Sequence, residues 1–292
     1  MRILIIGGNG MLGHELLSSY SNKFDVKVTL RNDLKEYSRY KLFTSENTID
    51  GIDVRSLEDV KTVLKEFSPD AVINTAGIIK QRDEARDYIQ SIEINALFPH
   101  KLSVICVKNG SKLIHMSTDC VFSGKKGNYT EDDISDAYDL YGRTKYLGEL
   151  EAEGCLTLRT SILGLELEYK KSLIEWFLKQ KGEVDGYCKA IYTGLTTMEM
   201  ARVIEFILLK YPDLSGLYQV ASKPISKYDL LNKLANKLNR NDISINPDFE
   251  FHCDRSLNAD RFRQATGYVG PSWDSMLDEL VDRIETRESG PL

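Results

Sequence analysis

Tyr141 and Lys145 stand four residues apart, and on a helix this spacing puts both side chains on one face. A neighbouring ammonium favours tyrosinate, so we expect Lys145 to lower the phenol pKa towards the working pH. Such a tyrosine can protonate a carbonyl oxygen as hydride arrives, or take the proton back in the reverse reaction. Thr118 follows an expected strand, from which its hydroxyl could bind the same oxygen. Together Thr118, Tyr141 and Lys145 predict a carbonyl reductase centre, although a Tyr-x-x-x-Lys pair alone is also typical of an ordinary helix surface.

A glycine-rich turn, Gly7-Gly8-Asn9-Gly10-Met11-Leu12-Gly13, follows the expected strand Arg2–Ile6 directly and opens an expected helix. Gly7 permits a tight turn, Gly10 lets the backbone approach a pyrophosphate, and Gly13 lets the helix pack closely on the strand. The helix N-terminus adds free N–H groups and a positive dipole. The alternative is a turn that serves packing alone. The placement after a strand favours dinucleotide binding by Gly7, Gly10, Met11, Leu12 and Gly13.

The end of the second strand, Val28-Thr29-Leu30-Arg31, bears on the choice of cofactor. An NAD site usually has a carboxylate here for the ribose 2′-hydroxyl, whereas a guanidinium suits a 2′-phosphate. Arg31 therefore favours NADPH, unless it is a solvated surface residue. Asp33 could serve NADH if the strand ends later.

Two further segments stand at expected strand ends, where open α/β sheets bind ligands. Asp53 and Val54 could contact the adenine through a carboxylate and a backbone N–H. The small residues that close the strand Ala71–Asn74 let the backbone come near the cofactor. They are Asn74, Thr75, Ala76 and Gly77.

These residues require a scaffold of alternating strands and helices, and the first 160 residues supply one. The apolar strands lack clean polar alternation, which is typical of strands buried on both faces of a parallel sheet. The pattern predicts an α/β, Rossmann-type doubly wound parallel sheet. The expected strands are Arg2–Ile6, Val26–Leu30, Ala71–Asn74, Lys112–Ser117 and Leu156–Arg159, and the expected helices are Met11–Ser19, Leu57–Phe67, Asp87–Val107 and Leu140–Glu151.

After Arg159 the pattern loosens, which predicts a smaller, discontinuous C-terminal substrate lobe. We assign residues 1–160 and 191–222 to the cofactor-binding domain and residues 161–190 and 223–292 to the substrate-binding lobe. Expected helices here are Ser172–Gln180, Met198–Leu209, Lys227–Leu238 and Trp273–Thr286, with short strands at Gly216–Val220 and Ile243–Ile245. We expect residues 287–292 to fray.

Composition excludes several classes of protein. The 292 residues carry 38 Lys and Arg against 44 Asp and Glu, a net charge of −6, which argues against nucleic-acid binding. The apolar runs are too short to span a membrane, and no signal peptide is recognisable. Five scattered cysteines without a CxxC pair argue against a metal site and disulfides and favour the cytoplasm.

With these motifs the chain resembles the extended short-chain dehydrogenase/reductases over essentially its whole length. Within them it is most similar to the dTDP-4-dehydrorhamnose reductase family. The similarity lies in residues 117–124, 141–145, 158–161, 255–258 and 271–273. The resemblance implies NAD(P)H-dependent reduction of a nucleotide-linked 4-keto-6-deoxysugar, in dTDP-rhamnose and polysaccharide biosynthesis. Tyr141 would donate the proton, Lys145 would hold the nicotinamide ribose and tune Tyr141, and Thr118 would orient the keto oxygen. A homodimer is an expectation from relatives.

The sequence departs from that family at two places. Cys120 replaces the usual aromatic residue, and Ile78-Ile79-Lys80-Gln81 replaces a segment that faces the substrate in relatives. Nucleotide-sugar 4,6-dehydratases carry Thr-Asp-Glu here, and Cys120 cannot act as their general acid, so the sequence argues against that activity. Three alternatives stay open: a sugar-nucleotide epimerase, reduction of a non-sugar carbonyl, and a non-catalytic NADP(H)-binding subunit that regulates or scaffolds a partner enzyme.

Overall fold

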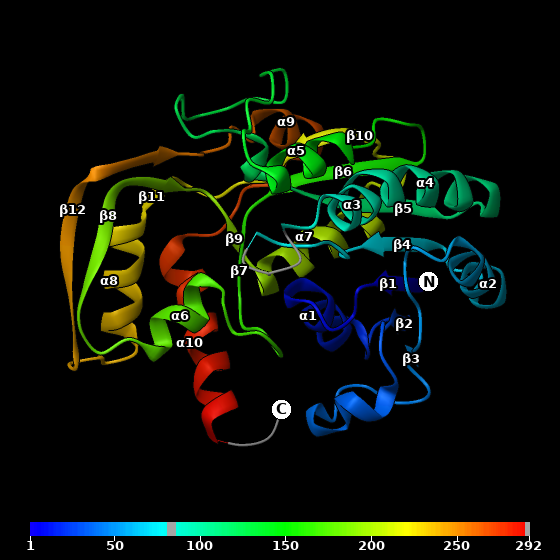
Figure 1. Cartoon of the computed structure of the whole chain (residues 1–292), viewed down its shortest axis with the longest axis horizontal. Coiled ribbons are helices and arrows are strands. Elements are labelled where there is room, and N and C mark those ends of the chain that lie inside the picture. Colours follow the sequence, from blue (N-terminus) through cyan, green and yellow to red (C-terminus); the bar gives the residue numbers. More distant parts are fainter. Residues whose placement is uncertain (81–85, 290–292) are drawn as a thin grey trace.

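A seven-stranded parallel sheet forms the larger part of the molecule in the computed structural model, which describes residues 1–80 and 86–289 (Figure 1). The strand order is β10-β6-β5-β4-β1-β2-β3, and every neighbouring pair is parallel. The strands are β1 (Arg2–Ile6), β2 (Asp25–Thr29), β3 (Thr48–Ile49), β4 (Ala71–Asn74), β5 (Lys112–Thr118), β6 (Cys155–Thr160) and β10 (Gly216–Gln219). This confirms the α/β, doubly wound parallel sheet predicted from the sequence.

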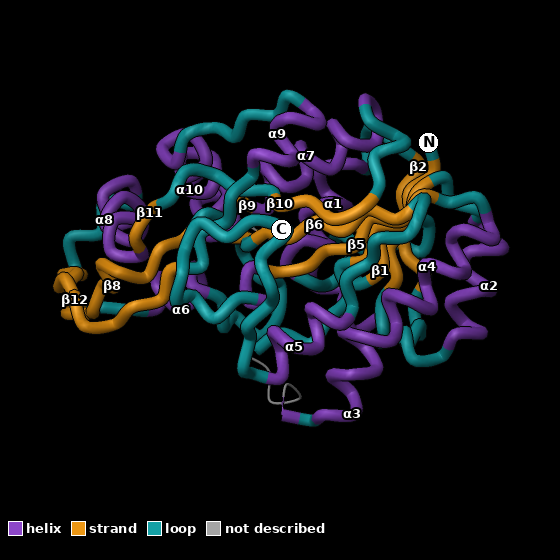
Figure 2. Tube along the Cα trace, turned by 90° about the horizontal axis from the view of Figure 1, so that it is seen from above, coloured by secondary structure: helices purple, strands orange, loops and turns teal. Residues whose placement is uncertain are grey.

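The central strand β1 shows why the strands lack polar alternation. Ile3 and Ile5 enter one hydrophobic core, whereas Leu4 and Ile6 enter a second core on the opposite face of the sheet. Helices therefore cover both faces, as Figure 2 shows for α7 on one side and α2 on the other. The first core includes residues of α1 (Met11–Tyr20) and α7 (Thr197–Lys210), and the second includes residues of α2 (Leu57–Phe67) and α4 (Phe98–Asn109).

A smaller region, made of a three-stranded sheet and several helices, lies beside the large sheet (Figure 1). In it β8 (Gly182–Tyr192) pairs antiparallel with β11 (Ile225–Ser226) and parallel with β12 (Ile243–Asp254). A two-stranded sheet of β7 (Ile162–Leu163) and β9 (Leu195–Thr196) follows β6. The helices after β7, apart from α7, are α6 (Leu173–Lys179), α8 (Lys227–Lys237), α9 (Asp260–Thr266) and α10 (Trp273–Ser289). In the described residues, no helix is long and apolar enough to cross a membrane.

The strands of the smaller region differ from the sequence prediction. The expected strand Ile243–Ile245 continues to Asp254, and its long partner β8 was not predicted at all. Both strands are largely exposed and contain charged residues, so no apolar pattern marks them. Backbone pairing with each other, rather than burial, holds them extended.

Helix ends also differ from the prediction. The expected helix Asp87–Val107 is divided into α3 (Tyr88–Ser91), a π-helical segment η3 (Ile92–Leu97) and α4. Helix α5 (Leu140–Leu147) stops before the expected Glu151, where Gly148 packs so closely that a Cβ on it would lie 2.0 Å from the Asn95 carbonyl oxygen. Of residues 287–292, which were expected to fray, Arg287 lies in α10 and pairs with the buried Glu175, and residues 290–292 lie outside the described residues. Two 3-10 segments, η1 (Leu34–Tyr40) and η4 (Asp119–Val121), complete the described elements used below.

Candidate active site

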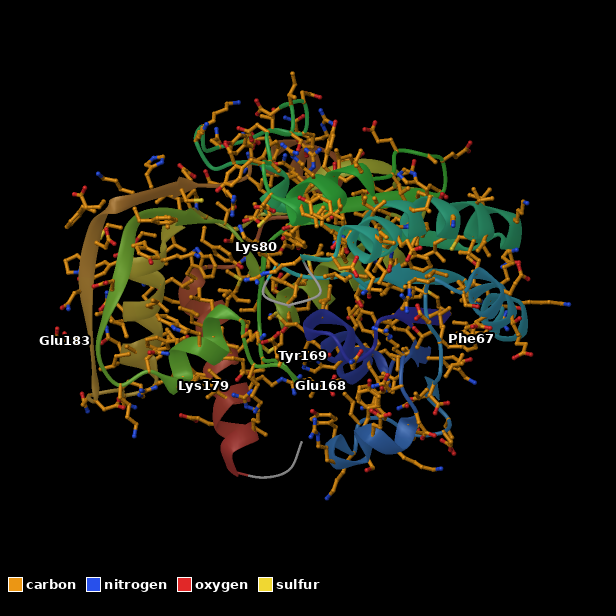
Figure 3. All side chains as sticks on the ribbon, in the orientation of Figure 1. Phe67, Lys80, Glu168, Tyr169, Lys179 and Glu183 are labelled. Carbon is orange, nitrogen blue, oxygen red and sulfur yellow. The ribbon has the colours of Figure 1, made fainter. Side chains whose placement is uncertain are left out.

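A cavity of about 500 Å³ lies between the large sheet and the smaller region. One wall comes from the carboxyl ends of parallel strands and the turns that follow them, where the chain crosses from one side of β1 to the other. Open α/β sheets bind ligands at this position. The other wall comes from β7, α6, the end of β8 and the chain around β12. Lys80, Glu168 and Tyr169 all line the cavity, and Figure 3 shows them between the large sheet and the smaller region.

The cavity brings together most of the site residues predicted from the sequence. Those that line it are Gly10, Met11, Leu12, Thr75, Ala76, Gly77, Thr118, Tyr141 and Lys145. The residues that lie outside its lining are Gly7, Gly13, Arg31, Asp53, Val54 and Asn74. Of the residues outside the lining, Gly7, Gly13 and Asn74 lie behind the sheet-side wall. Arg31, Asp53 and Val54 lie after the ends of β2 and β3.

Lys145 is buried and its Nζ donates a hydrogen bond of 2.6 Å to the carbonyl oxygen of Met116 on β5. Burial lowers the pKa of Lys145 to about 8. Burial also raises the pKa of Tyr141, and the Cys120 thiol adds to this effect. The expectation that Lys145 lowers the phenol pKa is therefore wrong in this arrangement, because desolvation dominates and the ammonium is bonded to the strand.

Thr118 ends β5 and begins the 3-10 segment η4, with its side chain at the wall of the cavity. Its Oγ1 accepts from the Cys120 N–H and donates to Asp119 Oδ1, both at 3.2 Å. The Thr118 side chain also acts as a hydrogen-bond partner that lowers the Tyr141 pKa against burial. Asp119 is itself buried, and burial raises its pKa. Thr118 and Tyr141 thus face the same part of the cavity.

A glycine inside the Tyr-Gly-x-x-Lys motif makes this approach possible. A Cβ on Gly142 would lie 2.2 Å from the Cys120 carbonyl oxygen, so α5 can pack against η4 only with glycine at this position. Asp139 caps α5 by accepting from the Gly142 N–H at 2.9 Å. Its carboxylate also pairs with Lys80 at 3.0 Å. The sequence pattern predicted a role for Tyr141 and Lys145 at the two ends of this motif, but not for its glycine.

Asn95, in the π-helical segment η3, was not predicted to have a role. Its side chain accepts from the Ile78 N–H at 2.8 Å and donates to the Ile78 carbonyl at 2.9 Å. It also donates to Thr144 Oγ1 on α5 at 3.3 Å. Asn95 thereby ties the chain after Gly77 to the helix that carries Tyr141. Of the unusual segment that the sequence analysis noted, Gln81 lies outside the described residues.

The glycine turn has the geometry expected of a cradle for a pyrophosphate. Gly7 has a φ of +90°, in the region that favours glycine, and a Cβ on Gly13 would lie 2.2 Å from the Gly7 carbonyl oxygen. Helix α1 starts at Met11, so the first N–H groups lack partners within the helix and stand at the cavity. A dinucleotide pyrophosphate fits these observations.

Asn9 and Glu168 add a contact that the sequence analysis missed. The Asn9 side chain, within the glycine turn, donates to Glu168 Oε2 at 2.8 Å. Glu168 belongs to the chain before α6, far from the turn in sequence, and no local pattern marks this pairing. The contact joins the glycine turn to the opposite wall of the cavity.

The residues expected at the adenosine end occupy the ends of β2 and β3. Arg31 has a side chain 60% exposed, with its Nε 3.8 Å from Asp53 Oδ2. Arg55 holds the Asp53 carboxylate more closely, at 2.6 Å, and this bonding lowers the Asp53 pKa. Asp33, the alternative NADH contact, instead caps η1 by accepting from the Lys35 N–H. Val54 packs against the second core.

Asn74 supports the wall from behind. It is fully buried, its Oδ1 accepts from the Ala76 N–H at 3.2 Å, and its Nδ2 lies 3.1 Å from His115 Nδ1 on β5. Because burial also lowers the His115 pKa, the imidazole is neutral and can accept from Asn74. Asn74 therefore orders the turn Thr75–Gly77 that lines the cavity.

The chain is similar in sequence to a known protein family and to several proteins of known name. A family model described as the RmlD substrate binding domain matches residues 1–285. A dTDP-4-dehydrorhamnose reductase from Aggregatibacter actinomycetemcomitans is 24% identical over 242 residues, which are 78% of this chain and 76% of the relative. The methionine adenosyltransferase 2 subunit beta of Danio rerio is 25% identical over 256 residues, which are 82% of this chain and 74% of the relative.

The same fold is found among solved structures. The dTDP-4-dehydrorhamnose reductase of Bacillus anthracis, crystallised in complex with NADP, superimposes with a TM-score of 0.78. The match covers 97% of this chain and 99% of that chain at 22% sequence identity. At this level of identity the likeness establishes the fold.

Proposed function

Because the chain belongs to the RmlD substrate binding domain family, we propose that it is an NADPH-dependent reductase of nucleotide-linked 4-keto-6-deoxysugars. The observation that carries the proposal is the single cavity lined by the glycine turn and by Thr118, Tyr141 and Lys145. The relative named dTDP-4-dehydrorhamnose reductase supports the substrate class.

In this proposal the cofactor lies along the wall formed by the large sheet. The backbone at Gly10, Met11 and Leu12 receives the pyrophosphate, with Gly7 and Gly13 allowing the close approach. Asp53 and Val54 contact the adenine, and Arg31 receives the 2′-phosphate. The strand-end residues Asn74, Thr75, Ala76 and Gly77 line or order the wall beside the nicotinamide half. NADPH, when bound, supplies the hydride for the keto carbon.

Side chains on α5 and beside η4 donate the proton to the substrate and orient the atom that receives it. A raised phenol pKa keeps Tyr141 protonated at neutral pH, which is the form that donates a proton to the keto oxygen. Thr118 orients that oxygen by a hydrogen bond. Lys145, whose pKa of about 8 leaves it charged at neutral pH, holds the nicotinamide ribose.

We also propose that the chain is divided into a cofactor-binding domain and a substrate-binding lobe. Residues 1–160 and 191–222 would bind the cofactor, and residues 161–190 and 223–292 would bind the nucleotide sugar. Cytoplasmic location, a homodimer and a role in dTDP-rhamnose synthesis also remain proposals.

The experiment follows the loss of NADPH absorbance when purified protein meets dTDP-4-keto-6-deoxysugar in the presence of the 3,5-epimerase. UDP- and GDP-linked equivalents and NADH run in parallel. We expect one nucleotide form to be reduced with one NADPH consumed per sugar. Binding of NADPH without consumption of any of these substrates would contradict the proposal.

A second candidate is a non-catalytic cofactor-binding subunit, which is favoured by the match to a protein named subunit beta of a methionine adenosyltransferase. It predicts NADPH binding, no turnover, and co-purification with an enzyme. A sugar-nucleotide epimerase would interconvert sugars with no net loss of NADPH. The same assay, with product analysis, therefore separates all three.

A further inference from the structure

Tyr192, the last residue of β8, has a buried hydroxyl that lacks a hydrogen bond of good geometry among the described residues. The side chain lines the cavity and the residue is 8% exposed. Its Oη makes no hydrogen bond of good geometry to any residue in the ranges 1–80 and 86–289; the nearest candidate is the Ser161 side chain, whose hydrogen bonding lowers the Tyr192 pKa against burial. Buried polar groups are rarely left unpaired, because the lost hydration is not replaced. Among the described residues the hydroxyl therefore lacks a well-formed hydrogen bond, and a ligand in the cavity is a candidate to supply one.

Packing rather than hydrogen bonding holds this hydroxyl in place. The Tyr192 ring lies against Trp273 with ring centroids 5.8 Å apart. The Oη lies over Gly194, where an added Cβ would approach it to 2.2 Å. Only glycine leaves room for the hydroxyl at this position. The phenol is thus fixed in one orientation at the wall of the cavity.

Tyr192 and the proposed proton donor Tyr141 line the same cavity, Tyr192 from the end of β8 and Tyr141 from α5. Burial raises the pKa of both phenols, and Asp119 and Cys120 of η4 raise it in both cases. The two phenols are therefore both within electrostatic reach of η4. Because its pKa is raised, the Tyr192 hydroxyl remains a neutral hydrogen-bond donor throughout the physiological range.

From this placement we propose that Tyr192 is a substrate-positioning residue, whose hydroxyl donates a hydrogen bond to a ring hydroxyl of the nucleotide sugar that Tyr141 protonates. The inference rests on the proposed function and names a requirement of that site. A sugar lacking this hydroxyl would leave the phenol unpaired, so the cavity selects hydroxylated rings over the deoxy analogue.

The test compares Tyr192→Phe with the native protein. We expect the KM for the keto sugar to rise about 10-fold to 100-fold, while the KM for NADPH stays unchanged. The melting temperature should stay the same or rise, because the substitution removes no hydrogen bond within the protein. Loss of substrate affinity without loss of stability is a result that a purely structural tyrosine would not give.

Tyr20→Phe is the matched control. The buried Tyr20 hydroxyl donates to the Ala201 carbonyl at 2.7 Å and does not line the cavity. Its removal should lower the melting temperature and leave both KM values unchanged.

Calorimetry keeps the inference separate from the proposed activity. The probes are dTDP-, UDP- and GDP-linked 6-deoxyhexoses that carry no keto group, each compared with its nucleoside diphosphate alone. We expect Tyr192→Phe to weaken binding of the sugar nucleotide and not of the nucleoside diphosphate. Equal affinity of native and variant protein, or no binding of any probe by the native protein, would overturn the inference. Absence of NADPH turnover with normal probe binding would instead count against the proposed function alone.

Discussion

The two walls of the cavity differ in how the side chains that line them are hydrogen-bonded. On the sheet side, Lys145 donates to the Met116 carbonyl, Thr118 to Asp119 and Thr75 to the Ile6 carbonyl. Unpaired atoms on this side, such as His115 Nε2, belong to residues behind the lining. On the other side, the hydroxyls of Tyr192 and Ser172 are buried without a partner among the described residues. Ser172 even precedes α6 as its N-cap residue, yet its side chain makes no capping bond.

Under the proposed function, this difference corresponds to a difference in role. Bonds within the sheet-side wall fix the proposed reacting groups before any ligand arrives, which reduces reorganisation during reaction. Unpaired buried groups lower stability, and we propose that those on the opposite wall gain partners when the substrate binds. Substitutions on the sheet-side wall should therefore lower the turnover number or the stability of the protein. Substitutions on the opposite wall should lower the affinity for the substrate.

The largest effect is expected for Tyr141→Phe. Loss of the proton donor should lower kcat for sugar reduction about 100-fold to 10,000-fold and leave NADPH affinity unchanged. Tyr146→Phe, four-tenths exposed on the same helix, is the control and should keep full activity. Steady-state kinetics with direct NADPH titration measure both quantities. Near-native turnover of Tyr141→Phe would contradict the assignment of the chemistry to this wall.

The next largest expected effect is that of Lys145 on the pH dependence of the free energy of unfolding. In the unfolded chain the lysine keeps its proton up to its usual pKa of 10.5, but in the folded protein it loses it near a pKa of about 8. Between these values the unfolded state binds more protons, so the free energy of unfolding rises with pH, by about 3 kcal/mol in total.

Lys145→Met should remove this rise. Urea unfolding of the ligand-free protein between pH 8 and pH 10.5 measures the slope for native and variant protein. The same slope in both would mean that the ammonium is not desolvated at this position.

A matched pair of alanine substitutions addresses the walls directly. Asn74→Ala removes the bonds to the Ala76 N–H and to His115, and should lower the free energy of unfolding by about 1–3 kcal/mol. Ser172→Ala breaks no side-chain bond and should change it by less than about 0.5 kcal/mol. Denaturant unfolding checks both. Equal losses would erase the contrast between the walls.

Arg31→Ala should have the smallest effect, because its guanidinium is exposed. We expect NADPH affinity to fall about tenfold through loss of one charge-assisted bond, while NADH affinity stays nearly constant. Lys23→Ala, which removes an exposed cation paired with Glu205, is the control for a change of net charge. Titration of cofactor fluorescence measures these affinities. An unchanged ratio of NADPH to NADH affinity would show that Arg31 does not select the cofactor.

Local sequence determined the sheet-side wall almost completely. The strands β1 and β4 and the helix α2 have the ends expected from their residues, because apolar runs, a glycine turn and helical periodicity are written in short stretches of chain. The residues Thr118, Tyr141 and Lys145 could be selected for the same reason, since each stands at a fixed place on a recognisable strand or helix.

Tertiary structure alone decided the opposite wall and the state of the groups between the walls. Strand β8 carries no apolar pattern, so nothing in its residues marked Tyr192. Its proposed role depends on packing against Gly194, two residues further on, and against Trp273, which lies far along the chain. The sequence likewise suggested that Lys145 would lower the Tyr141 pKa, whereas burial reversed the direction. Spacing along a chain specifies which side chains can share a face, but desolvation and the absence of a partner depend on everything packed around them.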